Sequence, residues 1–170
     1  MEMKKVSFTV PGEPVGKARP RTVRLRTRGR DREKVMTFTP EKTVIYENLV
    51  KTEYQQQCGD VCFASGQLRM ELKCYYGLAK SDSRKKRQAK LNGMLRPTKK
   101  PDIDNCIKAI ADSLNGLAYT DDTQIVEVIA EKWFDEKPRV EVAIMAAYAD
   151  HVQQNTEEVN RCESLLDLIT

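Results

Sequence analysis

Histidine, long apolar runs and paired cysteines are what this sequence has least of. His151 is the only histidine in 170 residues, which argues against histidine-based catalysis and against a zinc site. No run of about 18 apolar residues occurs, so the sequence predicts no transmembrane helix. The N-terminal residues lead directly into a strand pattern, without the apolar segment of a secretion signal. We therefore expect a cytoplasmic protein with no membrane partner.

The five cysteines are scattered, and their odd number does not suit a disulfide framework. Cys58 and Cys62 form a C-x-x-x-C pair. This is only a weak indication of metal binding or redox chemistry, because no second pair completes a zinc site. We expect free thiols.

Positive charge is abundant but unevenly distributed. Residues 17–34 carry nine Lys and Arg against two acids, and residues 80–100 carry nine against one. Because the whole chain has a net charge of only +4, the remainder must be strongly acidic. Two concentrated basic segments indicate a polyanionic partner, and nucleic acid is the commonest one.

Hydrophobic residues make up 40% of the chain, enough for the core of one domain, and no internal repeat or low-complexity linker divides it. Alternating apolar residues predict four strands, at residues 5–10, 67–76, 124–134 and 139–148. Helical spacing predicts three helices, at residues 40–57, 83–92 and 105–115. The predicted fold is a single α+β domain over residues 1–148, with a mixed β-sheet and the order β-α-β-α-α-β-β. Residues 135–138 should join the last two strands as a hairpin loop.

The first two predicted helices differ in what they can bury. The helix at residues 40–57 should begin with a Thr39 cap and Pro40 in its first turn. Its predicted buried stripe is Val44, Ile45, Leu49 and Val50, with Tyr46 and Tyr54 at the margin. The helix at residues 83–92 is basic and has few apolar residues, so it is either a solvated face or a surface that lies against phosphates.

Arginine recurs at every second position from Arg24 to Arg32. In an extended ribbon this spacing would place all the guanidinium groups along one edge. The alternative is a flexible basic loop, and we expect the stretch to remain flexible until it meets DNA.

Two acidic motifs lie close together in the sequence. Asp102 and Asp104 come immediately before the third helix, and Asp121 and Asp122 start the strand that follows it. If the chain is extended at the first motif, both of its carboxylates project to one side, with Asp104 as the helix cap. Lys108 lies one helical turn further on. Three or four carboxylates around one point would suit Mg²⁺ or Mn²⁺, which prefer oxygen ligands.

Each motif also has a simpler interpretation. An aspartate before a helix is usually a cap, and two aspartates in a loop usually form a turn. Lys108 could merely pair with Asp104 or Asp112 along the helix. We favour the metal site because both motifs occur together with Lys108 and with two basic segments.

Four stretches of the chain together resemble the RusA family of Holliday-junction resolvases, which is common in bacteria, phages and prophages. They are Gly12-Glu13-Pro14-Val15-Gly16-Lys17-Ala18-Arg19-Pro20-Arg21, Thr37-Phe38-Thr39-Pro40, Lys100-Pro101-Asp102-Ile103-Asp104-Asn105 with Lys108, and Tyr119-Thr120-Asp121-Asp122-Thr123-Gln124. The resemblance spans about residues 5–148. The basic stretch at residues 22–36 is longer than in the shorter members, and the tail after Tyr148 has no counterpart.

The resemblance implies a homodimeric, Mg²⁺-dependent endodeoxyribonuclease that cuts four-way DNA junctions by paired symmetric nicks, with Mn²⁺ as a substitute metal. Its catalytic residues would be Asp102, Asp104, Lys108 and Asp122, and the three aspartates would hold the metal. The basic segments would bind the DNA through Lys17, Arg19, Arg21, Lys85, Lys86, Arg87, Lys99 and Lys100. Two alternatives remain open, a non-catalytic nucleic-acid-binding protein of the same fold and a nuclease for RNA or other branched DNA.

The tail at residues 149–170 carries apolar residues in steps of three and four from Val152 to Ile169. This pattern predicts a C-terminal helix over about residues 151–168. The helix could fold onto its own domain or pair across a dimer, and a seam of fewer than three heptads is short for an autonomous coiled coil.

Overall fold

The computed structural model describes residues 5–26 and 33–147 of the chain. Its centre is a four-stranded sheet made of β1 (Lys5–Pro11), β4 (Leu68–Gly77), β5 (Ile125–Asp135) and β6 (Arg139–Ala146). In space the strands follow the order β1-β6-β4-β5. β6 is antiparallel to both of its neighbours, whereas β4 and β5 are parallel. The sheet is therefore mixed, and the predicted α+β class is confirmed.

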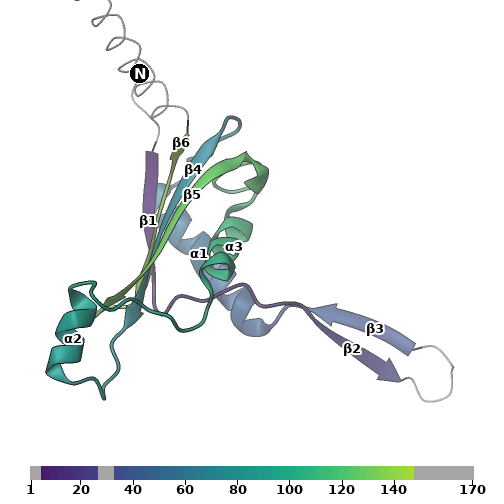
Figure 1. Cartoon of the computed structure of the whole chain (residues 1–170). Coiled ribbons are helices and arrows are strands. Elements are labelled where there is room, and N and C mark those ends of the chain that lie inside the picture. Colours follow the sequence, from purple (N-terminus) through teal and green to yellow (C-terminus); the bar gives the residue numbers. More distant parts are fainter. Residues whose placement is uncertain (1–4, 27–32, 148–170) are drawn as a thin grey trace, which may run out of the picture.

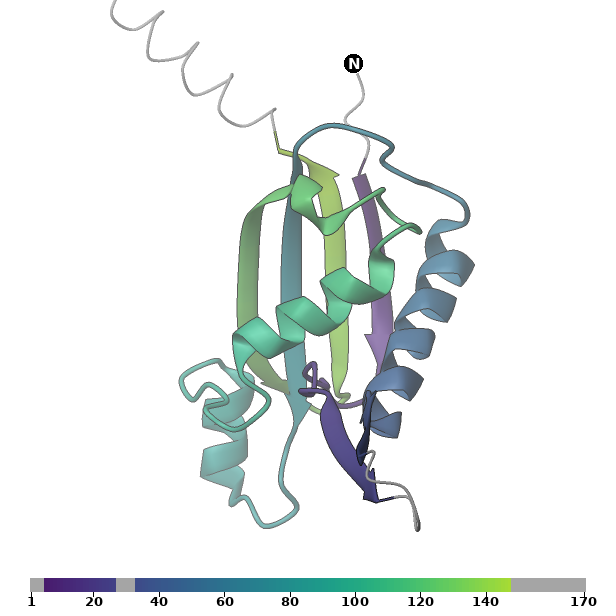
Figure 2. The ribbon, with the colours of Figure 1, turned by 90° about the vertical axis from the view of Figure 1, so that its right-hand side faces the viewer.

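Within the described residues, three α-helices accompany the sheet. They are α1 (Glu41–Cys58), α2 (Arg84–Leu91) and α3 (Ile103–Leu114). Figure 2 shows α3 crossing one face of the sheet and α1 along its β1 side, whereas α2 lies beyond one end of the strands. None of the helices among residues 5–26 and 33–147 has the length and apolar character needed to cross a membrane.

The core forms between the sheet and the two helices on its face. In β4 the five alternating residues Leu68, Met70, Leu72, Cys74 and Tyr76 are all buried, as the sequence pattern predicts. Val140, Val142 and Ile144 of β6 continue the same buried surface, whereas Ala146 at the strand end is exposed. α3 packs against this buried surface of the sheet.

The predicted hairpin between the last two strands is wrong. β5 and β6 are not neighbours, because β4 lies between them and pairs with both. Residues 136–138 therefore carry the chain across the end of β4, where Tyr75 pairs with Trp133 on one side and with Arg139 on the other. β4 is buried along a whole face, and in this arrangement both of its edges are hydrogen-bonded to a neighbouring strand.

The predicted buried stripe of α1 is half right. Val50 is buried and Leu49 packs partly buried against the core, whereas Ile45 is 61% exposed and Val44 is 40% exposed. The other buried residues of the helix are Thr43, Tyr46 and Tyr54. Tyr54 packs edge-on against Phe8 with ring centroids 5.3 Å apart, and its hydroxyl donates to the Val61 carbonyl. A tyrosine whose hydroxyl finds a partner can be buried, so the tyrosines face the core. The helix begins at Glu41 with Pro40, not Thr39, in the cap position.

The arginine-rich stretch contains a pair of strands that the prediction of a flexible loop missed. β2 (Arg21–Arg26) and β3 (Glu33–Phe38) pair antiparallel, and we call these two strands the basic ribbon. They add two strands after the first one, so the element order is β-β-β-α-β-α-α-β-β. Figure 1 shows the basic ribbon extending away from the sheet. Residues 27–32 and the predicted C-terminal helix lie outside the described residues.

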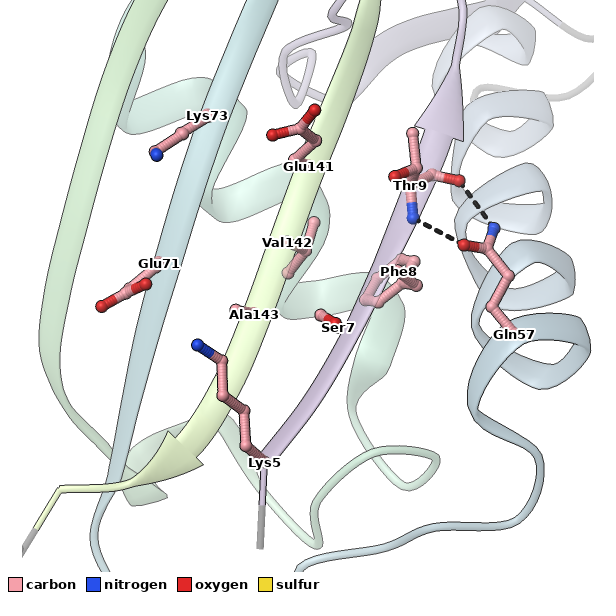
Figure 3. A pocket seen from close by; sticks show the side chains of 10 residues that line it. All are labelled: Lys5, Ser7, Phe8, Thr9, Gln57, Glu71, Lys73, Glu141, Val142 and Ala143. Atoms are coloured by element: carbon pink, nitrogen blue, oxygen red, sulfur yellow. Dashed lines mark hydrogen bonds between the residues drawn. The ribbon is translucent and has the colours of Figure 1, made fainter. Parts of the chain in front are cut away.

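The face of the sheet opposite α3 carries a hollow of about 330 Å³, seen in Figure 3. Two lysines, Lys5 and Lys73, alternate there with two glutamates, Glu71 and Glu141. Beside them the Gln57 side chain exchanges two hydrogen bonds with the backbone of Thr9, of 2.9 and 2.8 Å, which fixes the end of α1 to β1. Because acids and bases balance, this hollow does not suit a polyanion.

Candidate nucleic-acid interface and acidic site

The start of α3 positions the first acidic motif. Asp102 stands in the N-cap position with extended backbone angles, and its side chain makes no capping hydrogen bond. Asp104 lies in the first helical turn rather than in the cap, so the prediction that both aspartates share one extended segment is wrong. Both side chains are exposed. The carboxylate of Asp102 is therefore at the end of a helix without being used to stabilise it.

Asp102 lines a groove of about 700 Å³, which we call the basic groove. Its walls are the segment Pro14–Arg19, the start of α1 and residues 100–105. Four cationic residues line it, Lys17, Arg19, Lys42 and Lys100. The structure thus brings one predicted catalytic aspartate together with three of the predicted DNA-binding residues, and adds Lys42, which sequence reasoning missed.

Gly16 allows the segment before the basic ribbon to lie directly against α3. A Cβ at this position would be 2.7 Å from the Cβ of Pro101, closer than real Cβ contacts, and 3.0 Å from that of Asn105, which is also tight. The next residue, Lys17, donates its backbone N–H to the Asn105 carbonyl over 2.9 Å. A glycine is needed here because two backbones approach closely.

Lys17 does not present a free ammonium to the groove. Its Nζ contacts the Glu47 carboxylate of α1, and lies 3.1 Å from Oδ2 of Asp112 on α3. We call these three residues the Lys17 clamp. Burial lowers the pKa of Lys17, but its hydrogen bonds to Glu47 and Asp112 outweigh burial, so the pKa is raised. The ammonium therefore ties α1 to α3, which competes with its predicted role as a phosphate ligand.

The segment that leads into Asp102 is held from the sheet side by Lys132 of β5. Its Nζ donates to the carbonyls of Lys99 and Pro101, over 2.6 and 2.9 Å. The Tyr76 hydroxyl also donates to the Pro101 carbonyl over 3.3 Å. Sequence reasoning missed Lys132, although a signal was present, because a lysine interrupts the alternating apolar residues of this strand.

The second acidic motif begins a short 3-10 helix, η1 (Asp122–Gln124), at the start of β5. Asp121 forms its cap: the Thr123 backbone N–H donates to Oδ1 of Asp121 over 2.9 Å. Hydrogen bonds from the Thr123 side chain and then from its backbone hold the pKa of Asp121 below its usual range. Gln124 completes a capping box by accepting from the Asp121 N–H over 3.2 Å. Asp121 is thus used structurally, and Asp122 is the better candidate of the two for chemistry.

The two motifs do not converge within one chain. Asp122 starts η1, directly before β5 begins at Ile125, whereas the carbonyls of Lys99 and Pro101 are held by Lys132, seven residues further along the same strand. Seven strand residues span roughly 23 Å at about 3.3 Å per residue, so Asp122 and the first motif lie toward opposite ends of β5. Across the described part of the chain, no three His, Cys, Asp or Glu side chains are grouped so as to hold a metal.

The pair Asp102 and Asp104 still fits one mode of metal binding. Mg²⁺ commonly keeps several waters and uses only one or two carboxylates together with substrate phosphates. Lys108 is exposed on the same helix, and within the described residues it forms no ion pair with Asp104 or Asp112. The simple interpretation of Lys108 as a helix-stabilising partner therefore gains no support.

The predicted DNA-binding residues around α2 are in part engaged by acids. The Asp82 carboxylate accepts from Lys90 and lies 3.2 Å from Nζ of Lys86, and these cations, Lys90 first, hold the pKa of Asp82 at about 2. Arg87 lies 3.9 Å from a glutamate, Glu136. Of the three predicted residues on α2, Lys85 is exposed, whereas Lys86 and Arg87 each lie near a carboxylate.

Lys99 and Lys100 are exposed in the segment between α2 and α3, and Nζ of Lys99 is 3.9 Å from Oε2 of Glu13. Arg21 begins the basic ribbon. Figures 1 and 2 show α2 and the basic ribbon extending from the same end of the molecule. The two basic segments of the sequence thus frame the end where α3 begins, which is an arrangement that can hold a phosphate backbone.

Comparison with known proteins gives three findings. Residues 11–145 match the family described as endodeoxyribonuclease RusA. The chain is 39% identical over 142 residues to the uncharacterized protein YqaN of Bacillus subtilis (strain 168), and the aligned part is 82% of this chain and 94% of YqaN. It is 46% identical over 48 residues to the crossover junction endodeoxyribonuclease rusA of Lactococcus phage r1t, and this aligned part is 28% of this chain and 37% of the phage protein.

Proposed function

Because the chain belongs to the RusA family of endodeoxyribonucleases, we propose that it resolves four-way DNA junctions by paired symmetric nicks in a Mg²⁺-dependent reaction, in DNA recombination and repair. One observation carries the proposal. The exposed carboxylate of Asp102, unused as a helix cap, opens into a groove that Arg19, Lys42 and Lys100 make basic. Cations beside such a groove can hold a phosphate backbone without reading the bases.

The chemistry divides between the carboxylates and the cations. Asp102 and Asp104 would hold the metal, with Mn²⁺ as a substitute, and a bound divalent ion would supply Lewis-acid stabilisation and a water of lowered pKa. Arg19, Lys42 and Lys100 would position the scissile strand. Lys108, exposed one turn along α3, would stabilise the charge that develops on the phosphate.

Asp122 is proposed as a third metal-directed carboxylate on the strength of the family resemblance. In the single chain it precedes the start of β5, whereas the segment before Asp102 is held by Lys132 toward the other end of that strand, so Asp122 reaches the Asp102 pair only if DNA or a second subunit changes the site. Two nicks placed symmetrically require two sites, and we therefore propose a homodimer. The domain boundary at residue 148 stays a prediction.

A second function is favoured by one specific observation. The described residues hold no group of three potential metal ligands, which suits a non-catalytic nucleic-acid-binding protein of the same fold. Binding alone needs no divalent ion, so Mg²⁺-dependent cleavage separates the two functions. A nuclease for RNA or other branched DNA would use the same acidic residues and is separated only by its substrates.

The test is a cleavage assay with end-labelled four-way junction, linear duplex of the same sequence, a three-way junction and an RNA junction. Each is incubated with and without Mg²⁺. We expect paired cuts at symmetric positions in the four-way junction only, and only with the metal. Asp60→Asn serves as the matched control, because Asp60 is an exposed aspartate outside the basic groove. Binding without cleavage under every condition would support the non-catalytic alternative instead.

A further inference from the structure

The basic ribbon is a structural element that the proposed chemistry does not use. Its strands β2 and β3 pair with each other, and Figure 1 shows them extending away from the sheet and helices. An isolated two-stranded hairpin is marginally stable at best in water. A ribbon of this kind therefore gains stability from a partner that covers it.

The two sides of the basic ribbon differ in chemistry. Met36 and Phe38 of β3 are 49% and 48% exposed, and the register places Val23 and Arg21 opposite them. On the other side, the exposed hydroxyls of Thr22 and Thr37 meet at 3.3 Å, and Arg24 and Arg26 follow Thr22 at alternate positions of β2. The side of Met36 and Phe38 thus exposes a thioether and an aromatic ring, and the register also places the basic positions Arg21 and Lys34 on it. The other side exposes two threonine hydroxyls and carries the positions of Arg24 and Arg26.

The basic ribbon is continuous with the basic groove. Arg19 lies two residues before β2 and Pro40 lies two residues after β3, and both line the groove that contains Asp102. A nucleic acid seated in the groove would meet the base of the ribbon, where Phe38 is exposed. The acidic site, the basic groove and the basic ribbon are therefore continuous with one another.

We propose that the basic ribbon distinguishes a branched DNA from a continuous duplex, by placing Met36 and Phe38 against bases that are unstacked at the branch point. The proposal rests on the proposed function. Apolar side chains can insert between base steps or stack on bases, and these faces are accessible where stacking is interrupted. A two-stranded ribbon also fits the width of the DNA major groove.

Charge favours DNA over a second copy of this chain as the occupant. The segment at residues 17–34, which contains β2, carries nine Lys and Arg against two acids. Two such segments packed together would bring like charges into contact, whereas a phosphate backbone would neutralise them.

The test measures binding in EDTA, so that it does not depend on cleavage. Replacing Met36 and Phe38 together by serine should weaken binding to a four-way junction roughly fivefold or more, the loss expected for one base–aromatic stack. Binding to linear duplex should change less than about twofold, because phosphate contacts remain. Ile45→Ser with Val126→Ser is the matched control, since these side chains are 61% and 58% exposed outside the ribbon and groove.

A second variant tests for a second copy as the occupant. Because Arg21 and Phe38 are register partners, residues 22–37 can be replaced by an Asn-Gly turn without stretching the chain. This variant should lose the preference for junctions while keeping the molar mass and thermal unfolding of the wild type. An equal loss on junction and duplex, no loss at all, or a fall in molar mass would each overturn the proposal. A wild type that binds junctions through the ribbon but never cuts them would overturn only the nuclease function.

Discussion

Asp102 shows how a single residue can hold a structural position without a structural task. An aspartate at an N-cap normally accepts a backbone hydrogen bond and contributes about 1 kcal/mol to helix stability. The Asp102 side chain makes no such bond, whereas Asp121, which looks equally suited to chemistry in the sequence, is the one that caps. The capping hydrogen bonds thus distinguish a structural aspartate, Asp121, from one that is left available, Asp102, which the spacing of the motifs in the sequence does not.

The first prediction concerns the three proposed metal-directed carboxylates. Asp102→Asn, Asp104→Asn and Asp122→Asn should each abolish cleavage of a four-way junction, while junction binding stays equal or becomes tighter because a negative charge is removed. Gel-based cleavage and fluorescence anisotropy measure the two properties. Cleavage at the wild-type rate by any one variant would remove that residue from the site. For Asp122 it would mean that the exposed pair at the start of α3 is sufficient.

At the scale of elements, the Lys17 clamp and Gly16 decide where α3 begins relative to the groove. The segment Pro14–Arg19 lies against α3 because Gly16 has no Cβ, and the Lys17 ammonium then binds α1 and α3 at once. These contacts join three parts of the chain that are far apart in sequence. The acidic residues of α3 therefore depend on a lysine that does not belong to their motif.

The second prediction separates a clamp from a phosphate ligand. Lys17→Met keeps the aliphatic stem but leaves Glu47 and Asp112 without their cation, so it should lower the free energy of unfolding by roughly 1–3 kcal/mol, between the values for exposed and buried ion pairs. Urea denaturation measures this loss. The control Lys51→Met, at an exposed position of α1, should stay within about 0.5 kcal/mol of wild type. A stable variant whose salt dependence of DNA binding is weaker would instead assign Lys17 to phosphate binding.

The third prediction follows from the acid that anchors α2. The lowered pKa of Asp82, about 2 in the folded protein, means that its ion pairs stabilise the fold above the unfolded pKa near 3.8. This contribution is lost as the pH falls from about 4 to about 2. The difference in unfolding free energy between wild type and Asp82→Asn should therefore shrink across that interval. Denaturation at pH 7, 4 and 2.5 tests this, with Asp60→Asn as the control that shows no such change.

On the scale of the whole molecule, two basic segments that are distant in sequence extend from the same end. The open hollow on the opposite face of the sheet balances lysine against glutamate and offers no comparable surface. The two basic segments of the sequence thus lie together at one end of the folded molecule. This is the basis for expecting DNA to lie across one end of the domain.

The fourth prediction measures how much of that charge reaches phosphates. Affinity for DNA should fall steeply with salt, and replacing Lys85, Lys86 and Arg87 together by glutamine should make the logarithmic slope shallower by about 0.9 for each phosphate that the variant no longer neutralises. Because Lys86 and Arg87 lie near acids, most of the effect should come from Lys85. Lys51→Gln with Lys5→Gln is the control, because both lysines are exposed and Lys5 lines the hollow on the opposite face of the sheet. An unchanged slope in the triple variant would mean that α2 faces solvent when DNA is bound.

Local periodicity in the sequence was sufficient to predict the strands of the central sheet, the three helices of the domain and the buried face of β4, whereas the family was indicated by the resemblance of its motifs. The alternation of two residues in a strand and the spacing of 3.6 in a helix are properties of the chain itself. The stripe of α1 is the exception, because Tyr46 and Tyr54, predicted at its margin, are buried while Ile45 is exposed, and the Tyr54 hydroxyl finds a backbone partner only in the fold.

Only the tertiary structure decided which distant residues meet. The position of β4 between β5 and β6, the partners of Lys17 and the separation of Asp122 from the start of α3 all depend on pairings between segments that no local pattern encodes. Such pairings are selected by the combined burial of whole surfaces, to which each residue contributes little by itself. The sequence alone therefore determined the residue types available for chemistry, and the packing of α1, α3 and the sheet determined which of them share a site.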